Sequence, residues 1–120
     1  MVLSARTLRI IETLFPEEER EAVAELLLTE CSNTVAGCRD WRKPGLERLW
    51  ISVLKLSDGD ADKLLSAIDL ARLDYRDLFM AAGFGHDTDA HLRWEPTTTA
   101  QGSVGGLCRL LKRLTAHRRM

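Results

Sequence analysis

The densest group of side chains that could carry out chemistry lies between residues 86 and 91, where the sequence reads HDTDAH. Imidazoles and carboxylates bind divalent metals, and a metal-bound water can hydrolyse a substrate. Ligands on one face of a helix recur at i+3 or i+4, whereas His86 and His91 are five residues apart and diverge. Asp87 has the position of a helix N-cap and Asp89 that of a first-turn acid, so we expect both histidines to be partly exposed. We therefore assign no metal ligand, and a small metal-dependent hydrolase centred on His86 and His91 remains an alternative function.

Acidic and basic side chains also alternate around Tyr75. They are Asp69, Arg72, Asp74, Arg76 and Asp77. A paired acid and base could act in general acid–base catalysis if burial moved a pKa toward neutrality. Charges that alternate in sign along a helix are more typical of a solvated face with modest ion pairs, and we expect such a face here.

Motifs for nucleophilic and phosphate chemistry are missing from the sequence. There is no GxSxG, and the Gly83-Phe84-Gly85 segment does not complete GxGxxG or GxxxxGK. The sequence therefore predicts a non-enzymatic protein with no catalytic residue and no cofactor.

The cysteine pattern favours a reducing compartment. Cys31, Cys38 and Cys108 are odd in number and form no CxxC pair, so we expect structural thiols rather than zinc ligands or disulfides. No apolar run approaches the roughly 20 residues that a spanning helix needs. Glu12 interrupts the apolar N-terminal segment, so no secretory signal is expected. These observations predict a cytoplasmic protein.

The elements that position these groups are helices. At 120 residues, with 45% hydrophobic and 29% charged side chains, the chain fits one globular domain. Apolar residues recur at helical spacing over residues 4–14, 16–31, 46–57, 60–73, 74–82 and 86–94. The sequence therefore predicts an all-α fold: a compact bundle of five or six short helices, plus a basic amphipathic C-terminal helix.

Local signals set the ends of these helices. Ser4 is a candidate N-cap, Pro16 suits the first position of the second helix, and Asp74 is expected to begin a new helix. Gly83 suits a left-handed C-terminal position that would place Phe84 against the preceding turn in a Schellman motif. Two alternatives remain open: one continuous helix over residues 60–82, and a strand over residues 51–56, where apolar residues alternate. We expect Trp41 to attach the loop over residues 32–44 to the core.

The C-terminal segment differs from the rest of the chain in charge. Residues 1–96 contain 12 basic and 18 acidic side chains, whereas residues 97–120 contain five basic and no acidic ones. We divide the chain into a helical domain (1–96), a linker rich in small residues (97–106) and a basic amphipathic helix (107–120). An apolar face begins at Val104 and continues along this last helix with Leu107, Cys108, Leu111 and Leu114. The other face carries Arg109, Lys112 and Arg113.

A resemblance covers residues 13–96. The stretches LFPEEEREAVAELLLTEC, LERLWISVLKLSDGDADKLLSAIDLARLDYRDLFMAAGFG and HDTDAHLRWEP resemble a group of small helical bacterial proteins of unassigned function. The resemblance implies a helical, cytoplasmic protein in which the segment after Pro96 is an individual extension. It implies no catalytic or binding residue.

Three roles are open for the basic helix: closing the domain by packing Leu107, Leu111 and Leu114 on its core, contacting a nucleic acid, or binding a membrane surface or a partner. We predict a protein-binding module, such as a small adaptor, regulatory or immunity-like protein. A nucleic-acid-binding protein that uses this helix is the alternative. The candidate partner-binding residues are Arg109, Lys112, Arg113, Arg118 and Arg119.

Overall fold

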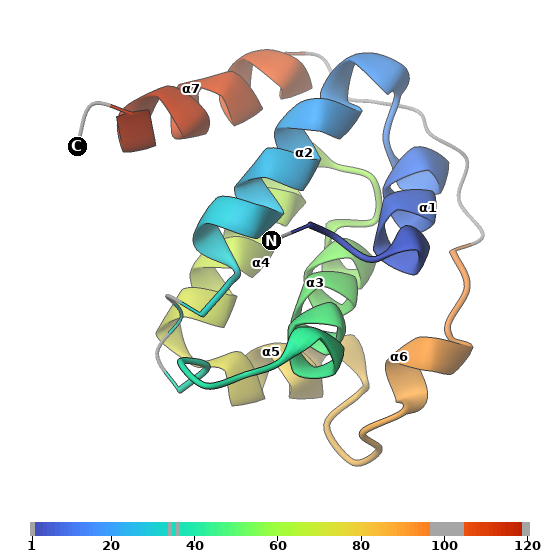
Figure 1. Cartoon of the computed structure of the whole chain (residues 1–120). Coiled ribbons are helices and arrows are strands. Elements are labelled where there is room, and N and C mark those ends of the chain that lie inside the picture. The colour runs from blue at the N-terminus through green and yellow to red at the C-terminus, as the bar shows by residue number, and fades with distance from the viewer. Residues whose placement is uncertain (1, 34, 36, 97–104, 119–120) are drawn as a thin grey trace.

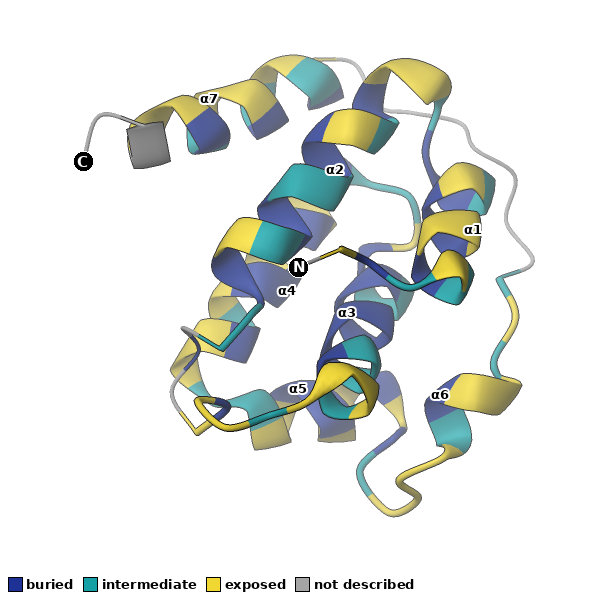
Figure 2. Cartoon of the chain, in the orientation of Figure 1, coloured by how far each residue is buried: buried dark blue, intermediate teal, exposed yellow. Residues whose placement is uncertain are grey.

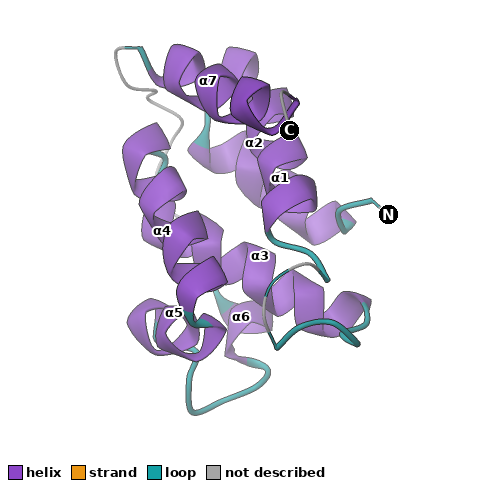
Figure 3. Ribbon diagram, turned by 90° about the vertical axis from the view of Figure 1, so that its left-hand side faces the viewer, coloured by secondary structure: helices purple, strands orange, loops and turns teal. Residues whose placement is uncertain are grey.

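The computed structural model describes residues 2–33, 35, 37–96 and 105–118, and within these ranges all regular structure is helical (Figure 3). The predicted all-α bundle is confirmed. The helices are α1 (Ala5–Leu14), α2 (Glu17–Glu30), α3 (Lys43–Ser57), α4 (Ala61–Leu73), α5 (Tyr75–Ala82), α6 (Ala90–Arg93) and α7 (Gly106–Arg118).

Helix α3 is the central element. It packs against α1, α4, α5 and α6, and most of its length is buried (Figures 1 and 2). Four consecutive residues, Ile51 to Leu54, are fully buried, so burial in this turn is not limited to one side of the helix. The alternative of a strand over residues 51–56 is wrong, because these residues belong to α3.

The start of α1 and the break before α2 follow the sequence signals closely. The Ser4 hydroxyl accepts a hydrogen bond from the Thr7 amide at 3.1 Å, as an N-cap does. Pro16 is the N-cap residue of α2 rather than its first helical residue. Three glutamates then occupy the first turn, where the helix dipole favours negative charge.

Two caps separate α4 from α5 and terminate α5. The Asp74 carboxylate accepts a hydrogen bond from the Arg76 amide at 2.9 Å, so the alternative of one continuous helix over residues 60–82 is wrong. Gly83 has a φ of 82°, in the left-handed region. The Phe84 amide donates to the carbonyl of Phe79 at 2.8 Å, which completes the predicted Schellman motif.

Helix α6 is shorter than predicted. It begins at Ala90, because the Asp87 carboxylate accepts a hydrogen bond from the Asp89 amide at 2.9 Å and so caps a turn that precedes the helix. The Arg6 side chain of α1 donates to the carbonyl of Trp94 at 2.7 Å. This bond connects the end of the α6 segment to the first helix of the chain.

Helix α7 lies across α2 at one end of the bundle, and both views place it outside the group formed by α1 to α5 (Figures 1 and 3). It packs against α2 and α4. The chain therefore brings its C-terminal helix back onto two helices of the acidic body.

Candidate functional site: the C-terminal helix

The inward edge of α7 is apolar. Leu110 and Leu114 are buried against the body. Leu107 is half-buried, and Leu111 is 47% exposed. The C-terminal helix thus closes the domain, but the expectation that Leu111 packs inward is wrong, and sequence analysis missed Leu110. Val104 lies outside the described residues.

A buried carboxylate anchors the middle of α7. The side chain of Glu30, the last residue of α2, is 2% exposed. Arg113 donates to both of its oxygens, from Nε at 2.9 Å and from Nη2 at 2.7 Å, and its Nη2 also donates to Asp69 of α4 at 2.5 Å. These hydrogen bonds raise the pKa of Arg113, so its guanidinium is held in the charged form.

A second ion pair lies one turn earlier on α7. Arg109 Nε is 2.5 Å from a carboxylate oxygen of Asp62 on α4. Arg109 and Arg113 therefore both turn toward the acidic body, although sequence analysis placed them on the face away from the apolar one. The reason is that α7 is rotated so that its arginines reach three carboxylates, and this rotation brings Leu110 inward and Leu111 outward.

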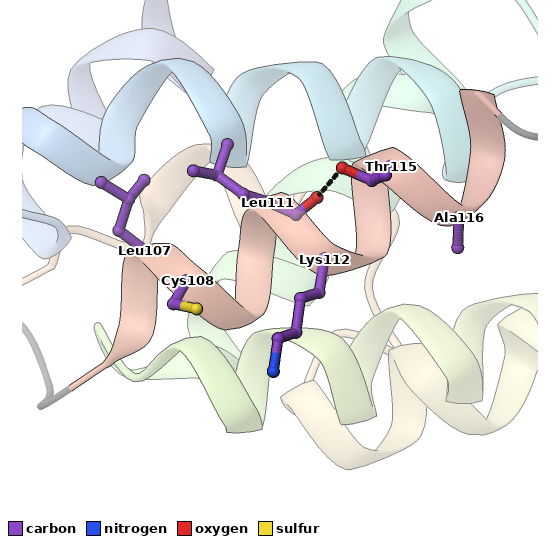
Figure 4. Close-up of a pocket in the computed structure, with 6 residues that line it drawn as sticks. All are labelled: Leu107, Cys108, Leu111, Lys112, Thr115 and Ala116. Carbon is purple, nitrogen blue, oxygen red and sulfur yellow. Dashed lines mark hydrogen bonds between the residues drawn. The ribbon is translucent and has the colours of Figure 1, made fainter.

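The outward side of α7 is also largely apolar, and we call it the outer face. A pocket of about 600 Å³ lies along it (Figure 4). It is lined by Leu107, Cys108, Leu111, Lys112, Thr115 and Ala116. The Thr115 hydroxyl donates to the Leu111 carbonyl at 2.9 Å, so its hydrogen-bonding need is met within the helix. Lys112 is the single charged side chain that lines the pocket.

The five candidate partner-binding residues therefore separate into groups. Arg109 and Arg113 are paired with carboxylates of the body, and Lys112 lies on the outer face. The side chain of Arg118 and the whole of Arg119 fall outside the described part of the chain.

The histidine segment is arranged differently from the expectation. His86 is exposed, but His91 is only 4% exposed, so its predicted partial exposure is wrong. Its ring packs edge-on against Phe84, with centroids 6.4 Å apart, and Nδ1 has no hydrogen-bond partner in the structure. Burial lowers the pKa of His91 and favours the neutral imidazole. Among the described residues, no three His, Cys, Asp or Glu side chains are grouped so that they could hold a metal ion.

The alternating charges around Tyr75 belong to two separate arrangements. Asp69 binds Arg113, and Arg72 is 3.5 Å from Glu30, so both belong to the α7 contact. Asp74 caps α5 and is 3.6 Å from Arg76. Only Asp74 and Arg76 of these paired groups lie next to Tyr75, and the side chains of both are exposed to solvent.

The three thiols also differ in exposure. Cys31 and Cys38 are buried, whereas Cys108 is exposed on the outer face of α7. Burial raises the pKa of Cys31, and it raises that of Cys38 to about 11. The two buried thiols are therefore protonated at neutral pH and act as small apolar side chains.

Glu30 is a further residue of this site that could have been predicted from the sequence. Its position supplied a signal, because it follows Val23, Leu26 and Leu27 by seven, four and three residues and so lies on the buried stripe of α2. An acid on an apolar stripe needs a cationic partner when it is buried. The arginines of the last helix were candidates for that partner.

Comparisons with known proteins provide no further assignment. No family model, no curated protein and no solved structure matches the chain. In the part of the chain that the structure describes, no helix is both long and apolar enough to cross a membrane.

Proposed function

We propose that this chain is a non-enzymatic protein-binding module that presents the outer face of α7 to a partner protein. One observation carries the proposal: a helix fixed on its inner side by Leu110, Leu114 and the Arg113–Glu30 ion pair still exposes apolar surface on its outer side. An apolar helix face that is held in place but uncovered is suited to docking.

The chemistry of the outer face points to an amphipathic helix as the partner element. Leu111 is the large apolar side chain available for contact, and the small side chains of Cys108, Thr115 and Ala116 allow a second backbone to come close. Lys112 lies in the same row and favours a carboxylate at the edge of the partner helix. We therefore expect a partner helix with an apolar stripe bordered by Asp or Glu.

The alternative of nucleic-acid binding has less support from the arrangement of charges. Arg109 and Arg113, two of the basic side chains that would contact phosphates, are paired with carboxylates of the body. Binding led by this helix would still predict an affinity that falls steeply as salt rises.

We place the protein in the bacterial cytoplasm, because its sequence suits a reducing compartment and resembles small bacterial helical proteins.

A matched pair of leucine substitutions tests the proposal. Leu111→Asp places a charge on the outer face, and Leu73→Asp makes the same change at an exposed leucine of α4 that is 82% exposed. Each folded variant and the wild type are immobilised at equal density and exposed to a nuclease-treated extract of the source organism, and bound proteins are quantified by mass spectrometry.

We expect one set of proteins to bind the wild type and Leu73→Asp but to be lost with Leu111→Asp. Retention of that set by Leu111→Asp would show that the outer face is not the docking surface. If the wild type enriches no protein but binds labelled DNA or RNA in a salt-dependent way, the nucleic-acid alternative replaces the proposal.

A further inference from the structure

The surface of α2 and α4 that α7 covers carries three carboxylates, from Glu30, Asp62 and Asp69, and we call it the acidic face. Ion pairs and buried leucines occur together on it. Arg109 and Leu110 form one Arg-Leu pair, and Arg113 and Leu114 form a second pair four residues later. The sequence of α7 thus offers the same two side chains, one charged and one apolar, on two successive turns.

These contacts select a particular kind of helix. Each arginine reaches at least one carboxylate, and Arg113 reaches two, so the acidic face favours a strongly basic helix. Leu110 and Leu114 are both buried in the contact, so the leucine must directly follow each arginine. A helix with the arginines in another register would bury a charge or expose its leucines.

The helices beneath the acidic face bury apolar side chains of their own. Val23, Leu26 and Leu27 of α2 are fully buried, as are Leu64 and Ile68 of α4. Helices α2 and α4 are joined to the rest of the bundle through α1, α3 and α5. The acidic face therefore rests on elements that have packing partners other than α7.

We infer that the acidic face is a helix-binding site in its own right, which accepts a basic amphipathic helix of a partner protein with two Arg-Leu pairs four residues apart in place of α7. Helix α7 is its built-in occupant. Because the outer face belongs to α7, such a partner would also release the surface of the proposed function from its fixed position on the body. This second site does not depend on the outer face binding anything.

A peptide added to the full-length chain tests the inference. A fluorescent peptide with the sequence of residues 105–118 is the probe, and its anisotropy is measured with the variant Arg109→Glu/Arg113→Glu, which repels its own α7 from the acidic face. We expect the variant to bind the peptide at least about tenfold more tightly than the wild type, whose tethered α7 competes at a high effective concentration. Binding should weaken between 50 and 300 mM NaCl, by roughly tenfold or more.

Two controls separate recognition from general attraction between charges. Lys112→Glu introduces a charge reversal on the outer face and should leave peptide binding as weak as in the wild type. A peptide of the same composition with its arginines and leucines in a different register should not bind the double variant. Equal binding of both peptides, or no gain in binding by the double variant, would overturn the inference.

Hydrogen exchange on the wild type provides a test that requires no variant. Excess unlabelled peptide should accelerate amide exchange in α7 of the intact chain, by about tenfold or more at saturation, and should leave the exchange of α3 unchanged. No change in α7 would overturn the inference even if the double variant failed to fold. Light scattering should show a monomer, and a dimer that the peptide dissociates would instead assign the acidic face to α7 of a second copy.

Discussion

Helices α3 and α7 are held in this protein by different kinds of contact. Helix α3 is enclosed by four other helices and buries side chains such as Leu49, Trp50 and Val53 on several sides. Helix α7 buries one edge through Leu110 and Leu114 and is otherwise attached by ion pairs. Apolar burial tolerates changes of salt and has no charge specificity, whereas the attachment of α7 depends on matched charges. The packing of α3 defines the fold. The attachment of α7 can be broken, and another helix with matching charges can replace it.

The largest effect is expected at the centre of α3. Trp50 is fully buried, and its indole N–H donates to the Cys31 carbonyl at 2.7 Å. Trp50→Ala removes both the apolar contacts and this bond, and should lower the free energy of unfolding by about 3–5 kcal/mol, measured by chemical denaturation. Trp50→Phe keeps most of the apolar contact but loses the hydrogen bond. Its smaller loss of unfolding free energy therefore reports mainly the cost of leaving the Cys31 carbonyl unpaired. A loss below about 1 kcal/mol for Trp50→Ala would contradict the central role of α3.

A smaller effect is expected where α7 meets the body. Arg113→Ala leaves the buried carboxylate of Glu30 without its two-bond partner, and should lower the free energy of opening α7 by about 1–3 kcal/mol, measured by native-state hydrogen exchange. Lys112→Ala removes a neighbouring charge from the outer face and should change this free energy by less than about 0.5 kcal/mol. Equal effects of the two substitutions would mean that the ion pair does not hold the helix.

The contact between α6 and α3 should respond to protons. His91 is buried, and the charged groups that act on it are Arg6, Glu47, Arg48 and Asp89. Because burial lowers the pKa of His91, the unfolded chain takes up a proton first as the pH falls below about 6.5. The free energy of unfolding should therefore decrease from that pH down to the lowered pKa.

Melting temperatures between pH 7.5 and 5 measure this decrease. His91→Gln should flatten that part of the pH profile relative to the wild type, whereas His86→Gln, at an exposed position, should preserve its slope. An unchanged slope in His91→Gln would assign the pH dependence to other groups.

The smallest effect on stability is expected at Cys108. Cys108→Ser should change the free energy of unfolding by less than about 0.5 kcal/mol, because the side chain is exposed. The same substitution should abolish the fast reaction of the native protein with a thiol reagent, since Cys31 and Cys38 are buried and their raised pKa values keep them protonated. Fast labelling of native Cys108→Ser would show that the body opens more readily than its packing indicates.

The parts of the fold that could be predicted from the sequence are those set by neighbouring residues. The caps at Ser4 and Asp74 and the left-handed Gly83 each depend on a few adjacent backbone groups. The strand alternative over residues 51–56 arose because several consecutive residues of α3 are buried, which weakens the helical period of apolar and polar residues. Local chemistry was sufficient for helix ends, and it was insufficient wherever burial depended on a distant segment.

The rotation of α7 and the burial of His91 are of this second kind. An isolated helix turns its leucines inward and its arginines outward, but the carboxylates of Asp62 and Asp69 lie more than 40 residues earlier in the chain and reverse that preference for Arg109 and Arg113. His91 is enclosed by contacts with α3 and Phe84, which its own segment does not encode. The opposite charges of residues 1–96 and 97–120 could be counted from the sequence, but not which side chains would meet.

Arg72 gives the α7 contact a further property. Its guanidinium lies 3.5 Å from the same Glu30 oxygen that Arg113 binds, yet it belongs to α4 and is half-exposed. When Arg113 departs with α7, the Glu30 carboxylate keeps Arg72 as a counter-ion from within the body. Arg72 therefore keeps a positive charge beside Glu30 whether or not a helix is docked on the acidic face.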